Sequence, residues 1–176
     1  MSDNDGGAVQ AAAGNEAGPS EAARLAERVA EAMYARDHAV KAHGISIEAV
    51  GPGYARLAMT VRPDMVNGHD LLHGGMTFTL ADSAFAYACN SYDERAVAQM
   101  ADIRFLAAGH SGDRLTAEAR EQHRAGRSGI YDITVSDQNG RVIALFRGQS
   151  RTIGGRVTED PGPGPAAAPN KQGRET

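Results

Sequence analysis

The sequence is poor in cysteine and contains no long uninterrupted run of apolar residues. Its single cysteine, Cys89, has no partner in the 176-residue chain, which excludes a disulfide-stapled fold and agrees with a reducing compartment. Without a long apolar run, no membrane-spanning helix is expected. The acidic opening, residues 1–5, precedes no apolar core, which argues against a secretory signal peptide. These absences predict a cytoplasmic protein with no membrane partner.

The sequence also lacks an excess of basic residues. Its formal net charge is −4. Asp3, Asp5 and Glu16 supply −3 of this, residues 155–176 are neutral in sum, and the remainder carries about −1. Because nucleic-acid-binding domains usually present a strongly basic surface, we expect no nucleic-acid partner.

Several catalytic motifs are missing. There is no Gly-x-Ser-x-Gly elbow, and Gly126-Arg127-Ser128-Gly129 has the wrong spacing for one. Neither a phosphate-binding loop nor a dinucleotide fingerprint occurs. His69 and His73 are four positions apart, but no Cys/His cluster surrounds them, so no metal is expected. Cys89 lies in an apolar stretch, where cysteine usually behaves as a small hydrophobe. No cofactor is predicted.

The most informative segment runs from Asn67 to Asn90. Its second half is rich in Ala, Leu, Phe and Met and contains neither Pro nor internal Gly, which predicts a helix that is apolar nearly all round. At about 15 residues this helix is too short to cross a bilayer. Since the flanking sequence alternates as strands do, we expect the helix to be buried inside a sheet.

Asp82 is the exception within this helix. It lies too far from the helix start to act as a cap, and burying a carboxylate is costly. At helical spacing it shares a face with mostly small side chains, namely Gly75, Phe78, Thr79, Ala86 and Cys89. A second copy or a ligand can approach such a face closely. The alternative is that Asp82 points into solvent at the sheet edge.

The helix entrance, His73-Gly74-Gly75, predicts an oxyanion site. Amides in a first turn lack intrahelical acceptors, and the helix dipole adds positive charge there. The Gly74 amide is placed to polarise a thioester carbonyl when its carbon is attacked. His73 orients that carbonyl or only packs the turn, and Asn67 holds a water or the loop. The segment therefore indicates an acyl thioester hydrolase.

A length argument constrains the assembly. Asp82 follows Gly75 by seven positions, which is about 10 Å along a helix. A base or nucleophile must come within about 3 Å of its target or of a bridging water. We therefore expect a homodimer in which two such helices lie antiparallel, so that each glycine entrance faces the other copy's Asp82.

The remaining pattern predicts an α+β domain. A helix begins after Ser20 with an apolar stripe at Leu25, Val29 and Met33. Six strands are expected, at residues 45–50, 54–61, 97–106, 115–124, 130–136 and 141–153. Their short turns favour an antiparallel curved sheet wrapped around the one central apolar helix. The composition of residues 1–19 and 155–176 predicts disordered tails around a domain at residues 20–154.

These residues resemble the PaaI-type phenylacetate-degradation thioesterases of the hotdog-fold superfamily. The resemblance covers about Glu21 to Gly155 and lies in Asn67-Gly68-His69, His73-Gly74-Gly75, Leu80-Ala81-Asp82, Phe85 to Ser91 and Phe146-Arg147-Gly148. It implies a hotdog fold, dimers joined into homotetramers, and hydrolysis of acyl-CoA thioesters, particularly ring-hydroxylated phenylacetyl-CoA. It assigns Asp82 as base or nucleophile and Gly74 as the oxyanion donor, with His73 and Asn67 as orienting groups.

The resemblance also implies a place for coenzyme A. The turn Gly126-Arg127-Ser128 is expected to hold that moiety, with Gly75 lining the substrate path. Basic side chains that could meet its phosphates are Arg124, Arg127, Arg147 and Arg151. Two features depart from the family pattern and predict an altered pocket, namely Asp102 and Ala107-Ala108-Gly109.

Two other functions stay open at this point. One is a non-catalytic acyl-CoA sensor on the same fold. The other is an acyl-CoA hydratase, which in this superfamily tends to use a different pairing of His and acid that this sequence lacks.

Overall fold

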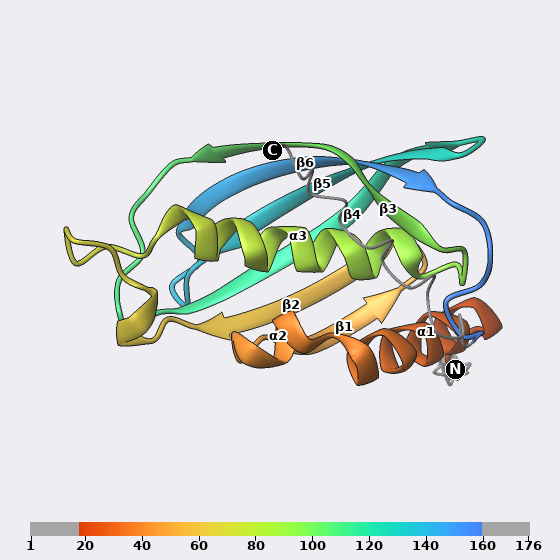
Figure 1. Cartoon of the computed structure of the whole chain (residues 1–176), viewed down its shortest axis with the longest axis horizontal. Coiled ribbons are helices and arrows are strands. Elements are labelled where there is room, and N and C mark those ends of the chain that lie inside the picture. The colour runs from red at the N-terminus through yellow and green to blue at the C-terminus, as the bar shows by residue number, and fades with distance from the viewer. Residues whose placement is uncertain (1–17, 160–176) are drawn as a thin grey trace, which may run out of the picture.

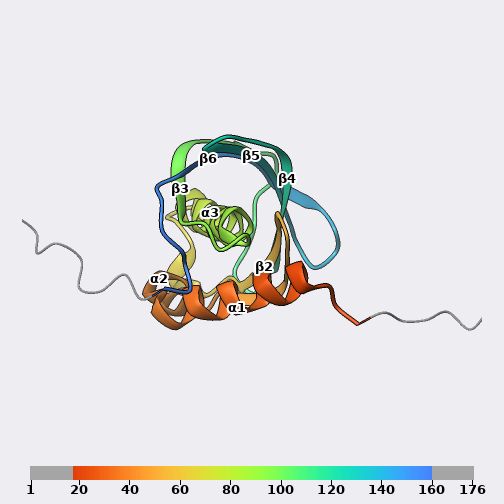
Figure 2. The same ribbon diagram turned by 90° about the vertical axis from the view of Figure 1, so that its right-hand side faces the viewer.

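The computed structural model of the chain describes residues 18–159. Its six strands form one antiparallel sheet in the order β1-β2-β4-β5-β6-β3. They are β1 (Ser46–Gly51), β2 (Tyr54–Thr60), β3 (Ala96–Phe105), β4 (Arg114–Ala125), β5 (Ser128–Ser136) and β6 (Val142–Thr152). The sheet curves around one long helix, α3 (Gly74–Asn90), as the view along that helix shows (Figure 2). The predicted hotdog architecture is confirmed.

Helix α1 (Glu21–Arg36) lies along the open side of the barrel-like curve, next to β1 (Figure 1). It begins where the sequence predicts, because the Ser20 hydroxyl accepts a hydrogen bond from the Ala23 amide at 3.2 Å. Two short elements were not predicted, α2 (His38–Ala42) and a 3₁₀ turn at Pro63–Met65. No helix in the described part of the chain is long and apolar enough to cross a membrane.

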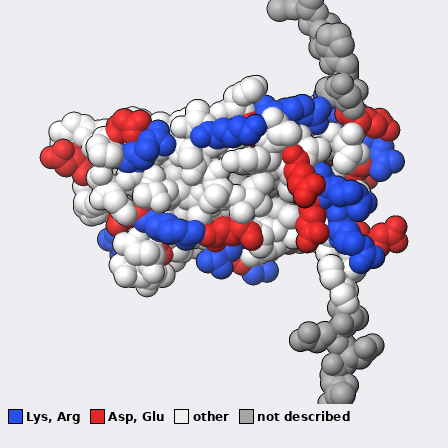
Figure 3. Space-filling model, turned by 90° about the horizontal axis from the view of Figure 1, so that it is seen from below, with Lys and Arg blue, Asp and Glu red and all other residues white. Residues whose placement is uncertain are grey.

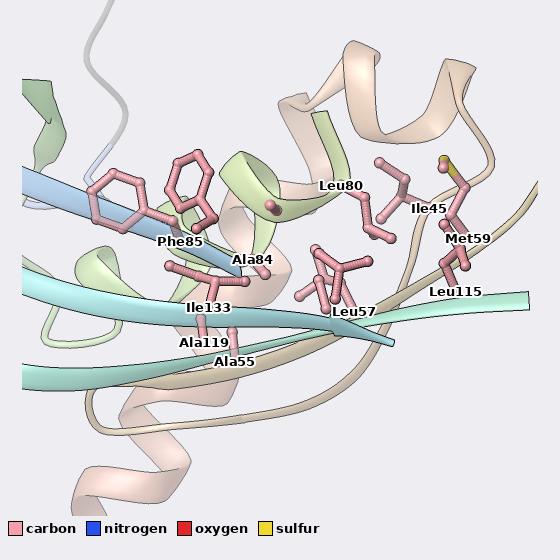
Figure 4. Packing of buried hydrophobic residues seen from close by; sticks show 14 of the residues in the cluster. Ile45, Ala55, Leu57, Met59, Leu80, Ala84, Phe85, Leu115, Ala119 and Ile133 are labelled. Atoms are coloured by element: carbon pink, nitrogen blue, oxygen red, sulfur yellow. The ribbon is translucent and has the colours of Figure 1, made fainter. Parts of the chain in front are cut away.

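The core lies between α3 and the concave face of the sheet. Leu80, Ala84 and Phe85 of the helix are fully buried and meet strand residues such as Leu57 and Ile133 (Figure 4). Along β5 every second residue is buried, the pattern of a sheet with one covered face. Gly148 of β6 lets the helix lie close to the sheet. A Cβ at this position would be only 2.9 Å from the ring of Phe85, so a larger residue would push the helix away.

The described chain continues past β6 along the end of the domain. Residues 155–159, which the sequence assigned to the tail, lie against the domain and bury Val157. The other residues of the two predicted tails lie outside the described part, apart from Gly18 and Pro19. Charges of both signs alternate around the margins of the face seen from below, and its middle is uncharged (Figure 3).

Candidate active site

The entrance of α3 leaves one backbone amide available. His73 is the N-cap, and its Nδ1 accepts a hydrogen bond from the Gly75 amide at 3.0 Å. A ring that accepts at Nδ1 carries its proton at Nε2, so Nε2 is a donor. The Met76 amide donates to the His73 carbonyl at 2.9 Å. Among the described residues the Gly74 amide has no acceptor, which makes it the free donor of this turn.

The cap itself predicts a stability effect. We expect His73→Ala to lower the free energy of unfolding by about 1 kcal/mol, because the Gly75 amide then loses its acceptor. His73→Asn keeps a capping oxygen and should retain most of that stability. Urea denaturation of the two variants and the parent checks this. Equal losses for both variants would mean that the ring stabilises the domain by packing instead of capping.

The Gly74 amide opens into a small cleft at the start of α3. This cleft of about 350 Å³ is lined by Asn67, Leu71, Leu72, Gly74, Thr77 and residues 105–109. Phe105 lies directly over Gly74, where an added Cβ would be 3.1 Å from its ring. Only glycine fits there without displacing the ring. Phe105 was not predicted as a site residue, and an aromatic residue near the end of a strand gives no sequence signal of this contact.

Asn67 mainly holds the loop before α3. Its side-chain oxygen accepts from the amides of His69, at 2.9 Å, and Leu71, at 3.3 Å. The side-chain NH2 has no acceptor among the described residues and lies in the same cleft as Gly74. The structure therefore brings two predicted groups together, Asn67 and Gly74.

Asp82 lies in a different cavity. This second cavity, of about 500 Å³, is bounded by α3, the first residues of β3, the end of α1 and the chain after β6. The carboxylate is half-buried and has neither a hydrogen bond nor an ion pair with the described residues. The hydroxyls of Thr79 and Ser83 on the same helix do not bond to it, since both donate to helix carbonyls. Burial raises the pKa of Asp82 above its ordinary value.

The two cavities cannot form one site within one protomer. Gly74 and Asp82 are eight positions apart on one continuous helix, which is about 12 Å. Along α3 runs a less buried stripe, formed by Gly75, Phe78, Thr79, Asp82 and Ala86. The predicted face of mostly small side chains is thus the face that the sheet leaves uncovered, although Cys89 at its end is buried.

None of the residues of the turn predicted to hold coenzyme A lines either cavity. Gly126 and Arg127 connect β4 to β5, with Gly126 in the left-handed region at φ +56°. The Arg127 guanidinium donates to the Thr152 carbonyl at 3.0 and 2.7 Å. Arg124 pairs with Glu94 at 2.6 Å.

The two departures from the family pattern fall in different places. Asp102 and Arg147 are neighbours on the convex face of the sheet, where Arg147 pairs with Asp132 at 2.6 Å. Neither lines a cavity next to Gly74 or Asp82. Ala107, Ala108 and Gly109 do line the Gly74 cleft, so only this departure bears on the pocket. No group of three or more His, Cys, Asp or Glu side chains in residues 18–159 could hold a metal.

Comparison with known proteins places the chain in a family. The model of the thioesterase superfamily matches residues 69–144, which contain both Gly74 and Asp82. The acyl-coenzyme A thioesterase PaaI of Escherichia coli is 49% identical over 129 residues, or 73% of this chain and 92% of the relative. The chain belongs to the thioesterase superfamily. The structure of the E. coli PaaI protein, from the phenylacetic acid degradation operon, matches this thioesterase with a TM-score of 0.75 and 47% identity. That match covers 76% of this chain and 97% of the other.

A more distant solved structure resembles this thioesterase as well. A hypothetical thioesterase of Streptococcus pneumoniae, solved with coenzyme A, is 25% identical with a TM-score of 0.64. The match covers 67% of this chain and 93% of the other. The hydrolase activity predicted from the sequence is therefore supported by homology, and the hotdog fold is shared with both structures.

Proposed function

We propose that this thioesterase hydrolyses acyl-CoA thioesters, with arylacetyl groups such as hydroxylated phenylacetyl as the preferred acyl part. The observation that carries this proposal is the pair of unpartnered groups on α3. One is an amide donor at Gly74 that its cap leaves free, and the other is a carboxylate at Asp82 that no neighbour neutralises. The PaaI relative, which is named an acyl-coenzyme A thioesterase, supports the substrate class.

In the proposed reaction the Gly74 amide donates to the thioester oxygen, where negative charge develops during attack. His73 Nε2 and the Asn67 NH2 orient the same end of the substrate. As a base, Asp82 accepts a proton from a water whose hydroxide adds to the carbonyl carbon; the C–S bond then breaks to give the acid, and the proton passes from Asp82 to the leaving thiolate, which departs as free coenzyme A. As a nucleophile, Asp82 adds to that carbon itself, and the C–S bond breaks to leave a mixed anhydride and the thiolate. A water then hydrolyses the anhydride, which frees the acid and Asp82 and supplies the proton of the thiol. A raised pKa suits a base, because a more basic carboxylate accepts the proton more readily.

The separation of the two groups supports a composite site in a homodimer. Strand β3 is an edge strand that pairs only with β6, and it exposes apolar side chains such as Met100, which is 62% exposed. A long exposed edge with apolar side chains is suited to pairing with another strand. If a second copy pairs along β3, the uncovered stripe of α3 meets its counterpart about a two-fold axis.

Further parts of the proposal rest on the resemblance. They are the assembly of two dimers into a homotetramer, the contact of Gly75 with the substrate, and the contact of Gly126, Arg127 and Ser128 with coenzyme A. A cytoplasmic location, where acyl-CoA esters and reduced thiols occur, also stays a prediction.

Complementation between two defective copies tests the composite site. Co-expression of Asp82→Asn with a Gly74→Pro copy, which lacks the donor amide, should restore activity. Each mixed dimer then has one intact site, and random pairing gives about one quarter of the parent activity. Tandem affinity tags on the two copies isolate the mixed dimers for assay. If purified mixed dimers are as inactive as either variant alone, the composite site is wrong.

Thiol release separates the enzyme from the two alternative functions. With phenylacetyl-CoA, 3-hydroxyphenylacetyl-CoA and straight-chain esters, a thiol reagent reports hydrolysis directly. A sensor binds these esters and releases no thiol. A hydratase changes the absorbance of an enoyl-CoA and releases no free thiol. Either result would overturn the proposed function.

A further inference from the structure

The Asp82 cavity is bordered by a segment that follows the last strand. Its walls include Met33 near the end of α1 and four residues after β6, namely Ile153, Arg156, Val157 and Glu159. Asp82 and Asn90, both on α3, also line it, and they are eight positions apart, about 12 Å along the helix. The cavity thus extends from the carboxylate toward the C-terminal end of α3. We call residues 155–159 the strap.

The chain after β6 runs down beside the C-terminal end of α3 toward α1 (Figures 1 and 2). The amide of Arg95, just after α3, donates to the Gly155 carbonyl at 3.1 Å. The Arg36 guanidinium at the end of α1 donates to the Val157 carbonyl at 2.8 Å. These bonds fix the strap to the end of α1 and to the loop between α3 and β3.

One buried carboxylate anchors the strap. Asp93, whose side chain is 3% exposed, accepts from the Thr158 amide and hydroxyl, both at 2.9 Å, and from the Arg156 Nε at 2.7 Å. Burial by itself would raise the pKa of Asp93, but these hydrogen bonds hold it below its ordinary value. Bonds to a buried charged acceptor are costly to break, so the strap is held firmly.

We propose that the strap, anchored on Asp93, ends the acyl pocket and sets the length of acyl group that this thioesterase accepts. This inference rests on the proposed function, since it takes the cavity beside Asp82 as the acyl pocket. A volume of about 500 Å³ lies within the roughly 300–1,000 Å³ of pockets that hold small ligands. Most of its exposed lining is apolar and includes Phe85, Val97 and Val157, which suits a hydrocarbon or aryl group and leaves the thioester at Asp82. Charged residues line it too, and two of them, Arg36 and Arg156, already donate to the Val157 carbonyl and to Asp93. Met33 and Val157 are the side chains that the distal end of the acyl group meets.

Acyl-chain selectivity tests the strap. We expect Asp93→Asn to raise the ratio of kcat/KM for dodecanoyl-CoA over phenylacetyl-CoA roughly tenfold, because a loosened strap opens the far end of the pocket. Val157→Ala, which leaves the anchor intact, should raise the same ratio several-fold. Thiol release with both esters gives the ratio. If Asp93→Asn does not fold, Val157→Ala decides.

A matched control exists at the opposite end of the sheet. Asp137 is also 3% exposed at its side chain, pairs with Arg141 at 3.0 Å and accepts from two turn amides. Asp137→Asn should therefore cost comparable stability and leave the selectivity ratio unchanged. An unchanged ratio in both strap variants overturns the strap inference while hydrolysis by the parent stands. No thiol release by the parent from any ester overturns the proposed function and the inference with it.

Discussion

Replacing Asp82 by asparagine is expected to lower kcat by about 10²- to 10⁴-fold, the usual contribution of a positioned base. The hydroxyls of Thr79 and Ser83 on the same helix cannot take its place, since they donate to helix carbonyls and are much weaker bases than a carboxylate. Size-exclusion chromatography should show an unchanged oligomer, because asparagine has nearly the same shape. Turnover close to that of the parent would remove Asp82 from the mechanism.

The pKa of Asp82 adds a pH signature to this result. Because burial raises the pKa above 3.8, the parent should lose activity as the pH falls through the raised value, when the carboxyl gains its proton. The same shift in the pKa of Asp82 also makes the stability of the fold depend on pH. As the pH rises from 3.8 through the raised value, the unfolded chain ionises first, so this group then favours unfolding. Asp82→Asn should therefore melt no lower than the parent at neutral pH, and calorimetry checks this. A large drop in Tm would point to a structural role.

Replacing Gly74 by proline is expected to lower kcat about 10²- to 10³-fold, the cost of removing one oxyanion donor. Proline deletes the amide hydrogen and adds ring carbons beside Phe105, and the first helical position is where proline is best tolerated. The preceding residue also permits it: His73 has φ −64° and ψ 130°, in the extended region that precedes proline.

Gly74→Ala is the matched control for this change. Both residues add a Cβ, which lies 3.1 Å from the Phe105 ring, but alanine keeps the amide hydrogen. The alanine variant therefore shows what the added Cβ costs, and the further loss in the proline variant reports the removal of the donor together with the ring carbon that takes its place. Thiol release from phenylacetyl-CoA gives both values. If proline and alanine are equally active, the Gly74 amide is not the oxyanion donor.

The core of the fold was predictable because local signals agree with the final packing. Strand alternation predicted all six strands, and a stretch rich in Ala, Leu, Phe and Met without Pro or internal Gly predicted α3. Ser20 has a side chain that marks a helix start by itself, and it caps α1 as expected. Helix α2 was missed because five residues give no periodic signal; it begins at the cap of Asp37, which accepts from the Val40 amide.

The candidate site was predictable only where chemistry and local structure coincide. Gly74 and Asp82 stand out because a glycine pair at a helix start and an acid in an apolar helix are both unusual. Phe105, Asp93 and Val157 gave no such signal, since their roles come from contacts between segments distant in the sequence. For Arg124 the sequence suggested a phosphate contact from its charge alone. In the structure this arginine pairs with Glu94 in the loop after α3, a contact that the sequence does not show.

The helix α3 serves two tasks on opposite sides. Leu80 and Phe85 anchor it in the core, while Gly74 at its start and Asp82 on its open side hold the proposed reacting groups. A shift of about 1 Å in such groups can cost a hundredfold in rate. A core substitution that shifts α3 by this much would therefore lower the rate of hydrolysis before it prevented folding. Substitutions chosen to raise the thermal stability would have to keep α3 in its present position.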